Sequence, residues 1–201
     1  MTPFEKYGKL HVNGKDLADE NNNTVVLRGI STHNLNEYPQ YVNEDAFKQF
    51  RDEYSVSIMR LAMYSGFADN HNGYADSDDV HREELENIIV KGVEICDKLG
   101  LYVMVDWHIL LDYDPNMHTD MAIRFFKSIC GKLKKYDNVI YEICNEPNMN
   151  LETKELVPWE DIKKYADQVI PVIREIDESK VIIVGTHTWS QGVDDAADSP
   201  L

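Results

Sequence analysis

The chain has 201 residues, and its 36 acidic side chains against 20 basic ones give a formal net charge of −16. Nucleic-acid binding depends largely on a basic surface, so this balance excludes a protein that binds phosphate backbones. Hydrophobic residues make up 43% of the chain, enough for a packed core. No apolar run approaches the roughly 20 residues that span a bilayer, so we expect a soluble globular protein without a membrane partner.

The N-terminal segment predicts a β-hairpin. Residues 10–17 read Leu-His-Val-Asn-Gly-Lys-Asp-Leu, with Asn13-Gly14 in a two-residue turn. Such a hairpin ahead of the first strand can close one end of a barrel. We find no internal repeat and no linker rich in Pro, Gly or Ser, so residues 1–201 are expected to form a single domain.

The rest of the chain alternates short apolar strands with amphipathic helices. Five strands are predicted to begin near Val25, Ser57, Tyr102, Val139 and Val181. The three later strands are almost continuously apolar, which is typical of parallel strands buried on both faces. Strict βαβα order predicts an α/β fold, either a barrel or a doubly wound sheet.

Helix boundary signals lie between these strands. We expect Asn43 to cap the first helix, Gly100 to end the second in a left-handed conformation, and Thr119 to cap the third. Pro158 is expected at the first position of the fourth helix, where its missing N–H costs nothing. Pro171 should kink that helix, because a proline ring crowds a carbonyl one turn back.

Polar residues follow each predicted strand. In a (β/α) barrel these strand ends meet on one face, where the active site is built. A doubly wound fold usually carries a glycine-rich phosphate turn, and this sequence has none. The pattern therefore favours a barrel, with candidate site residues at 31–33, Tyr64, 107–108, 145–146 and 186–189.

Arg60 lies within an apolar strand, at residues 57–63. A guanidinium in that position must be paired with a carboxylate, since an unpaired buried charge is very costly. Asp106, Glu142 and Glu146 are the candidate partners. Two readings stay open: a structural ion pair in the barrel interior, or a fixed cation that keeps a catalytic carboxylate ionised.

Glu146 is the first candidate for catalysis. It follows the apolar strand at 139–145 and precedes Pro147, which favours an extended conformation for Glu146 and so ends the strand there. A carboxyl at a barrel mouth beside an apolar strand can have its pKa raised, so that it works as a general acid near neutrality. The neighbouring Asn145 is placed to donate a hydrogen bond to a hydroxyl group of a ligand.

Five segments, taken in order, resemble the successive strand motifs of glycoside hydrolase family 5, and most of all its bacterial endo-β-1,4-glucanases. They are LRGISTH at 27–33, MRLAMY at 59–64, VDWHIL at 105–110 with DPN at 114–116, NVIYEICNEP at 138–147, and IIVGTHTWSQ at 182–191. The resemblance runs from about residue 7 to residue 201. It implies a (β/α)8 TIM barrel, of which this chain covers about the first five βα units.

The resemblance also implies a retaining mechanism, with one carboxylic acid protonating the glycosidic oxygen and a second carboxylate attacking the anomeric carbon. Glu146 then corresponds to the acid/base, Asn145 to the residue near the 2-hydroxyl, and Arg60 to the guanidinium that holds the nucleophile ionised. His108 belongs with them at the catalytic subsite. The implied substrate-binding residues are His33, Tyr64, Tyr38 and Trp189, with Trp189 as an aromatic platform for a neighbouring sugar.

Three departures from the family pattern stand out. Glu37, with Tyr38 beside it, occupies a position where these cellulases often carry Trp, and His187 stands where the family often has Gly. The family places its nucleophilic Glu on the seventh strand, and no residue here matches that motif. We therefore interpret the chain as the N-terminal five-eighths of a barrel, whose expected partner is the remaining C-terminal barrel segment.

Several alternatives remain. The same barrel is also compatible with a mannanase, a lichenase, a xyloglucanase or a catalytically incomplete carbohydrate-binding fragment. A metal site is a further alternative, because His108, Asp112, Asp114 and His118 lie close together, although their spacing fits no zinc or EF-hand pattern. We expect no cofactor and no metal.

Since polymeric glucan cannot cross a membrane, we expect an exported or cell-surface enzyme, although residues 1–7 show no secretory signal.

Overall fold

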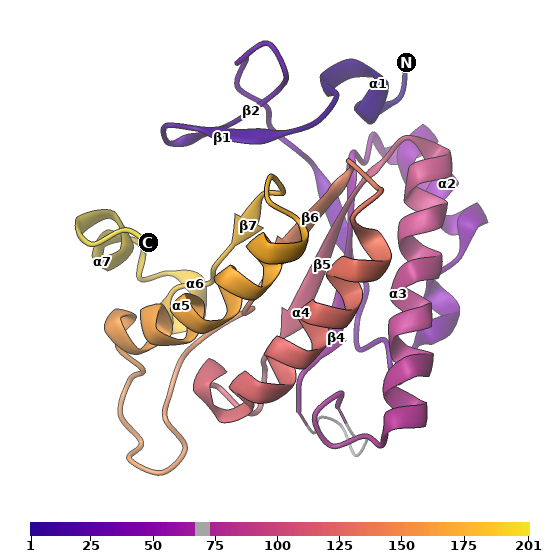
Figure 1. Cartoon of the computed structure of the whole chain (residues 1–201). Coiled ribbons are helices and arrows are strands. Elements are labelled where there is room, and N and C mark those ends of the chain that lie inside the picture. Colours follow the sequence, from indigo (N-terminus) through magenta and orange to yellow (C-terminus); the bar gives the residue numbers. More distant parts are fainter. Residues whose placement is uncertain (67–72) are drawn as a thin grey trace.

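The computed structural model describes residues 1–66 and 73–201. The chain begins with a short helix and a hairpin and continues as alternating strands and helices (Figure 1). In chain order the elements are α1 (Pro3–Tyr7), β1 (His11–Asn13), β2 (Asp16–Ala18), β3 (Gly29–Ser31), η1 (Pro39–Tyr41), α2 (Glu44–Tyr54), β4 (Ile58–Tyr64), α3 (Asp79–Leu99), β5 (Tyr102–His108), η2 (Pro115–His118), α4 (Thr119–Leu133), β6 (Val139–Glu142), α5 (Trp159–Ile176), β7 (Ile182–Ile183), α6 (His187–Ser190) and α7 (Val193–Asp198).

Strands β3 to β7 form one parallel sheet in the order of the sequence. Each strand pairs with the next one along the chain, and helices connect consecutive strands, as the βαβα pattern predicts. The carboxyl ends of all five strands therefore lie along the same edge of the sheet. This edge is at the bottom of Figure 1, opposite the N-terminal hairpin.

The strands are buried on both faces, but the two faces differ. On β4, Met59, Leu61 and Met63 belong to the main hydrophobic core between the sheet and helices α2 to α5. Arg60 and Tyr64 alternate with them and point to the inner face, because successive side chains of a strand point to opposite sides. This alternation places Arg60 and Tyr64 on the face that a barrel would enclose, whereas Trp107, from the candidate range 107–108, packs in the main core.

The hairpin lies over the amino ends of the strands, as expected. Leu10 and Leu17 pack in a second apolar cluster with Tyr102 and other strand-start residues, and the Tyr102 hydroxyl donates to the carbonyl of Gly8 at 2.6 Å. The predicted turn is one residue off. Asn13 pairs with Asp16, so residues 14 and 15 form the two-residue turn, and Gly14 takes the left-handed conformation with φ +62°.

Two helix boundaries agree with the sequence signals and two shift by one residue. The side chain of Asn43 accepts from the backbone N–H of Ala46 at 3.1 Å, and Gly100 ends α3 with φ +65°. The N-cap of α4 is His118, so Thr119 is its first helical residue and uses its hydroxyl to bond the Asn116 carbonyl. Pro158 is itself the N-cap of α5.

The sheet differs from prediction mainly at its first strand. That strand begins at Gly29 and not near Val25, because the backbone N–H of Val25 donates to Leu17 in the hairpin. The backbone then crosses to the sheet, and Val26 is 75% exposed.

Helix α5 continues through Pro171, which lies on its exposed face. No helix within the described ranges has an apolar stretch long enough to cross a bilayer.

Candidate active site

Arg60 is the centre of a polar network on the inner face of the sheet. Its Nε donates to Oε2 of Glu142 at 2.7 Å, and its Nη2 lies 2.9 Å from Oδ2 of Asp106. Nη2 also donates to Oδ1 of Asn145 at 2.7 Å. The prediction that Arg60 pairs with interior acids is confirmed for Asp106 and Glu142. The third candidate, Glu146, acts on Arg60 only as a more distant charge.

The strand register explains how these residues meet. Asp106 on β5 stands level with Ala62 on β4 and with Glu142 on β6. Arg60 lies two residues before that level, roughly 6–7 Å back along its strand. Its long side chain spans the difference and brings the guanidinium between the two carboxylates.

In this network, burial and the charge of an oppositely charged neighbour shift the pKa of a side chain in opposite directions. The Asp106 side chain is fully buried and that of Arg60 is 21% exposed. Burial alone would lower the pKa of Arg60, but the carboxylates of Asp106 and Glu142 raise it, so the guanidinium stays charged. For Glu142, burial and the charge of Asp106 outweigh Arg60 and raise the pKa of the carboxyl.

His108 joins this network through both ring nitrogens. Its Nδ1 lies 2.7 Å from Oδ2 of Asp106 and its Nε2 lies 3.2 Å from Nδ2 of Asn145. Because the amide nitrogen of Asn145 can only donate, Nε2 is the acceptor and Nδ1 carries the proton given to Asp106. The Asn145 amide is fixed in turn, since its Nδ2 also donates to the carbonyl of Ile109 at 3.0 Å.

An aromatic row extends from His108 toward the first strand. The ring of Tyr64 stacks on that of His108, with centroids 4.4 Å apart and planes at 9°. The Tyr64 hydroxyl lies 3.3 Å from Nε2 of His33, and His33 packs edge-on against Tyr38 at 5.5 Å. The structure thus brings together four residues that the sequence assigns to the site: His33, Tyr38, Tyr64 and His108.

Glu146 is half-buried and directly follows the network residue Asn145. The loop after β7 holds its backbone in place: Ser190 Oγ donates to the Asn145 carbonyl at 2.7 Å, and the N–H of Trp189 donates to the Pro147 carbonyl at 3.3 Å. Sequence reasoning missed the part played by Ser190, although a hydroxyl in the segment after a strand end is a signal for such a bond.

Gly185 is a second residue that sequence reasoning missed. A Cβ atom at this position would lie 2.2 Å from the Asn145 carbonyl oxygen and 2.6 Å from that of Cys144. Only glycine lets the ends of β6 and β7 approach so closely. The sequence signal is a glycine directly after an apolar strand.

Trp189 does not join the aromatic row. It lies beyond Glu146, on the side of β6 and β7, and is 50% exposed. His187 also turns away from the network, since its Nε2 lies 2.6 Å from Oδ2 of Asp195 in α7 and its Nδ1 lies 2.9 Å from the Thr188 hydroxyl.

Asp112 and Asp114, considered above as metal ligands, accept hydrogen bonds from neighbouring loop residues. Asp112 accepts from the Ser65 hydroxyl at 2.5 Å and from the N–H of Leu110, and Asp114 accepts from the backbone and side chain of Asn116. Within residues 1–66 and 73–201, no three His, Cys, Asp or Glu side chains are grouped as a metal site.

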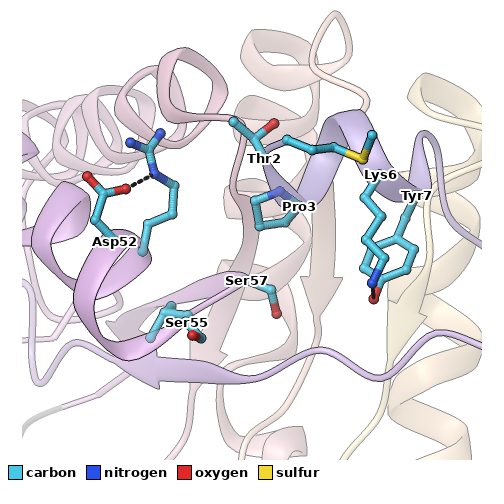
Figure 2. A pocket seen from close by; sticks show the side chains of 10 residues that line it. Thr2, Pro3, Lys6, Tyr7, Asp52, Ser55 and Ser57 are labelled. Carbon is cyan, nitrogen blue, oxygen red and sulfur yellow. Dashed lines mark hydrogen bonds and ion pairs between the residues drawn. The ribbon is translucent and has the colours of Figure 1, made fainter.

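A hollow also lies at the other end of the sheet (Figure 2). It measures about 520 Å³ and is lined by residues of α1 and by the turn that leads into β4. Thr2, Pro3, Ser55 and Ser57 line it, beside the exposed pair of Arg51 and Asp52. Because these groups are far from the strand ends and form no buried polar network, we place the candidate active site at the carboxyl edge.

Comparisons with known proteins agree with this placement. The family profile described as "Cellulase (glycosyl hydrolase family 5)" matches residues 18–201. Endoglucanase A of Butyrivibrio fibrisolvens is 42% identical over 195 residues, which are 97% of this chain and 43% of that protein. Endoglucanase E-5 of Thermobifida fusca is 40% identical over 192 residues. The chain thus spans less than half the length of these curated relatives.

Solved structures of cellulases also superpose on this chain. The cellulase Cel5C_n superposes with a TM-score of 0.86 at 41% identity, covering 100% of this chain and 60% of that one. The catalytic domain of Thermobifida fusca endoglucanase Cel5A, solved as a variant with cellotetraose, gives 0.87 at 37% identity and 63% coverage. The five-stranded sheet is the corresponding part of their (β/α)8 barrel. The chain belongs to glycoside hydrolase family 5.

Proposed function

We propose that this chain is part of the catalytic domain of a retaining endo-β-1,4-glucanase. The main support for the proposal is the hydrogen-bonded network next to Glu146, at the strand ends of a family 5 barrel. This network consists of Arg60, Asp106, Glu142, Asn145 and His108. A single main core that joins β4 to β7 with helices α2 to α5 supports one domain over residues 1–201.

In the proposed mechanism Glu146 donates a proton to the glycosidic oxygen. A carboxylate then attacks the anomeric carbon, and Glu146 later removes a proton from the water that hydrolyses the glycosyl-enzyme. Asn145, fixed by Arg60 and Ile109, is the proposed partner of the 2-hydroxyl. His33, Tyr64 and Tyr38 line the proposed catalytic subsite with His108.

The hydrogen bonds of Arg60 support a role beside the nucleophile. Its Nη1 has two N–H groups, and one faces the Ser31 hydroxyl at 3.3 Å. The Nδ1 of His108 is also 3.3 Å from Nη1, but it is a donor and cannot accept. Among the residues that the structure describes, the second N–H has no acceptor. A carboxylate placed there would accept it and stay ionised beside the guanidinium.

In the family pattern, that carboxylate is the glutamate of the seventh strand. Residues 1–66 and 73–201 contain five strands of the barrel sheet, and the chain covers 60% of the solved cellulase Cel5C_n, so we propose that the nucleophile comes from polypeptide outside this chain. Glu142 is a poor alternative, because burial and Asp106 raise the pKa of its carboxyl and its Oε2 is already bonded to Arg60.

The proposed substrate is cellulose or a related β-glucan, and the proposed location is outside the cell because such polymers do not cross membranes. The relatives are named endoglucanases, and one solved relative holds cellotetraose. Mannan, mixed-linkage glucan and xyloglucan are the competing substrates for the same barrel.

The test uses the enzyme that contains this chain. Reducing ends released from carboxymethylcellulose, mannan, lichenan and xyloglucan are measured for wild type and for Glu146→Gln, which keeps the shape of the side chain but cannot supply a proton. We expect preferential cleavage of the β-1,4-glucan and a loss of about 100-fold or more in the variant. Binding of glucan without turnover by the wild type would contradict the enzymatic assignment.

A further inference from the structure

Glu86, a buried acidic residue on α3, lies outside the polar network described above. It is 5% exposed, although a charged side chain is seldom buried without partners. Its Oε2 accepts from the hydroxyl of Ser128 at 2.5 Å and from Nζ of Lys132 at 2.7 Å, both on α4. Its Oε1 accepts from the hydroxyl of Tyr74 at 2.6 Å. The carboxylate therefore joins two helices to a residue of the loop that follows β4.

Tyr74 is fully buried on the core side of the sheet. Its ring packs edge-on against Trp107 and Phe125, with ring centroids 5.6 and 5.2 Å away. A buried tyrosine needs a hydrogen-bond partner for its hydroxyl, and Glu86 is that partner. Burial and this hydrogen bond raise the pKa of Tyr74, so its hydroxyl keeps its proton and remains a donor. The bond to Glu86 therefore fixes the position of Tyr74 in the core.

The backbone of Tyr74 completes the hydrogen bonding of β4 at the end that carries Tyr64. The carbonyls of Arg60 and Ala62 accept from N–H groups of the segment that follows β3. Alternate residues of a strand bond to the same neighbour, so the Tyr64 carbonyl is the next acceptor on this edge. It accepts from the N–H of Tyr74 at 2.9 Å. Tyr74 thus takes the place of a neighbouring strand at the end of β4.

Arg82 on α3 holds the same segment by its backbone. Its Nε donates to the carbonyl of Tyr74 at 2.9 Å and its Nη2 to the carbonyl of Ala75 at 2.7 Å. The N–H of Ala75 donates in turn to the carbonyl of Ser65 at 2.8 Å. Arg82 and Glu86 are four residues apart and therefore lie on the same face of the helix. One turn of α3 holds the loop by both its backbone and its tyrosine hydroxyl.

The ring of Tyr64 connects this anchor to the candidate active site. It stacks on the ring of His108 with centroids 4.4 Å apart and planes at 9°, and its hydroxyl lies 3.3 Å from Nε2 of His33. The direction of the ring depends on the Tyr64 backbone, whose carbonyl is bonded to Tyr74. Strand ends open locally when they lose such contacts, so the stack depends on the anchor.

We propose that Glu86 and Tyr74 are positioning residues for the stacked rings of Tyr64 and His108. The bond between Glu86 and Tyr74 holds the loop against the end of β4 and keeps the two rings parallel. Neither positioning residue is part of the candidate active site. The consequence for catalysis rests on the proposed function, because it assigns these rings to the catalytic subsite, whereas the consequence for the stack does not.

NMR of the enzyme that contains this chain, with isotope-labelled histidine, tests the effect on the stack. A proton over the face of an aromatic ring is shifted upfield, so the ring protons of His108 resonate upfield while Tyr64 is stacked on it. Tyr64→Leu identifies this signal and gives its position without the stack. Tyr74→Phe removes only the hydroxyl that bonds Glu86. We expect it to move the His108 signal most of the way to the position in Tyr64→Leu.

Two further variants separate positioning from stability. Glu86→Gln still bonds the Tyr74 hydroxyl, through its amide oxygen or nitrogen, and should retain the upfield signal. The matched control is Tyr136→Phe, since the Tyr136 hydroxyl bonds Glu94 at 3.3 Å, nearer the carboxyl end of the same helix. It should leave the signal unchanged. Spectra are recorded below the unfolding transition of every variant, so that each signal comes from folded protein.

A wild-type His108 signal in folded Tyr74→Phe would overturn the proposal, because the bond would then stabilise the core only. A signal equally displaced in Glu86→Gln and Tyr74→Phe would overturn it as well, since the glutamine preserves the bond to the hydroxyl. These spectra need no substrate. They therefore decide about the anchor even if the wild type fails to hydrolyse glucan, which is the result that would refute the proposed function.

Steady-state rates on cellotetraose test the consequence for catalysis. Misplacement by 1 Å costs up to about 100-fold in rate, so we expect kcat/KM to fall about 10-fold in Tyr74→Phe. Glu86→Gln and Tyr136→Phe should stay close to wild type. A displaced His108 signal in Tyr74→Phe together with wild-type kcat/KM would overturn the positioning role in the reaction.

Discussion

The Nε of Arg60 on β4 bonds Oε2 of Glu142 on β6 at 2.7 Å, although β5 lies between the two strands. Two strand spacings separate them, about 10 Å in all. Arginine covers this distance and still uses its other nitrogens for Asp106 and Asn145. The Arg60 side chain therefore links β4, β5 and β6, and it also holds Asn145, the residue next to Glu146.

We predict that Arg60→Leu lowers the free energy of unfolding by about 3–5 kcal/mol, because it leaves the carboxylates of Asp106 and Glu142 without their cation. Urea unfolding at pH 7 measures this. The control is Arg124→Leu, which breaks only the pair of Arg124 with the exposed Asp79 and should cost about 0–1 kcal/mol. A similar cost for both variants would show that the Arg60 network adds no special stability.

The pH dependence of stability tests the Glu142 carboxyl. Its pKa is raised above the ordinary 4.5 by burial and by Asp106. A group with a raised pKa stabilises the fold fully below its unfolded pKa, and this contribution is lost as the pH rises through its folded pKa. Glu142→Gln has no such loss, so its stability relative to wild type should increase as the pH rises above 4.5.

Urea midpoints at a series of pH values from acid to neutral check this. Glu83→Gln, on the exposed face of α3, is the control for the replacement of a glutamate by glutamine. If the stability of Glu142→Gln relative to wild type fell as the pH rises, Arg60 would dominate and the pKa of Glu142 would be lowered.

Gly185→Ala tests the close approach of β6 and β7. The added methyl group would lie 2.2 Å from the Asn145 carbonyl oxygen, so the backbone next to Glu146 must move. We expect about 1–3 kcal/mol of destabilisation and a loss of about 100-fold in kcat, since catalysis is sensitive to shifts of 1 Å.

Gly131→Ala is the control, because a Cβ there meets nothing within 4 Å and Gly131 lies in α4. It should stabilise the helix by about 0.5–1 kcal/mol. Unfolding curves and steady-state rates distinguish the two variants, and full activity in Gly185→Ala would show that the Asn145 backbone can shift without harm.

Much of the fold follows from local sequence signals. The cap at Asn43 and the stop at Gly100 depend on a few neighbouring atoms, so the sequence predicts them correctly. The start of the first strand depends on a distant partner: Val25 pairs with the hairpin and not with β4. Pattern alone cannot show which partner a backbone N–H finds, and the strand predicted to begin near Val25 begins four residues later, at Gly29.

In the site, too, residue types predict the interacting groups, whereas their distances and orientations depend on the fold. A buried arginine requires a carboxylate, so the strand sequences alone predict three candidate partners, Asp106, Glu142 and Glu146, but not which two of them pair with it. Their distances depend on the register of three strands. The separation of Trp189 from the aromatic row, and the turn of His187 toward Asp195, depend on a left-handed loop that residue types do not predict.

The most direct test of the account is the product that Glu146→Ala forms from 2,4-dinitrophenyl cellobioside in the presence of azide. This leaving group needs no proton, so the glycosyl-enzyme still forms, and azide can replace the water that Glu146 would activate. We predict that azide restores turnover and yields the β-glycosyl azide, identified by NMR. Formation of the α-glycosyl azide, or undiminished hydrolysis of β-glucan by this variant without azide, would contradict the assignment of Glu146 as the acid/base.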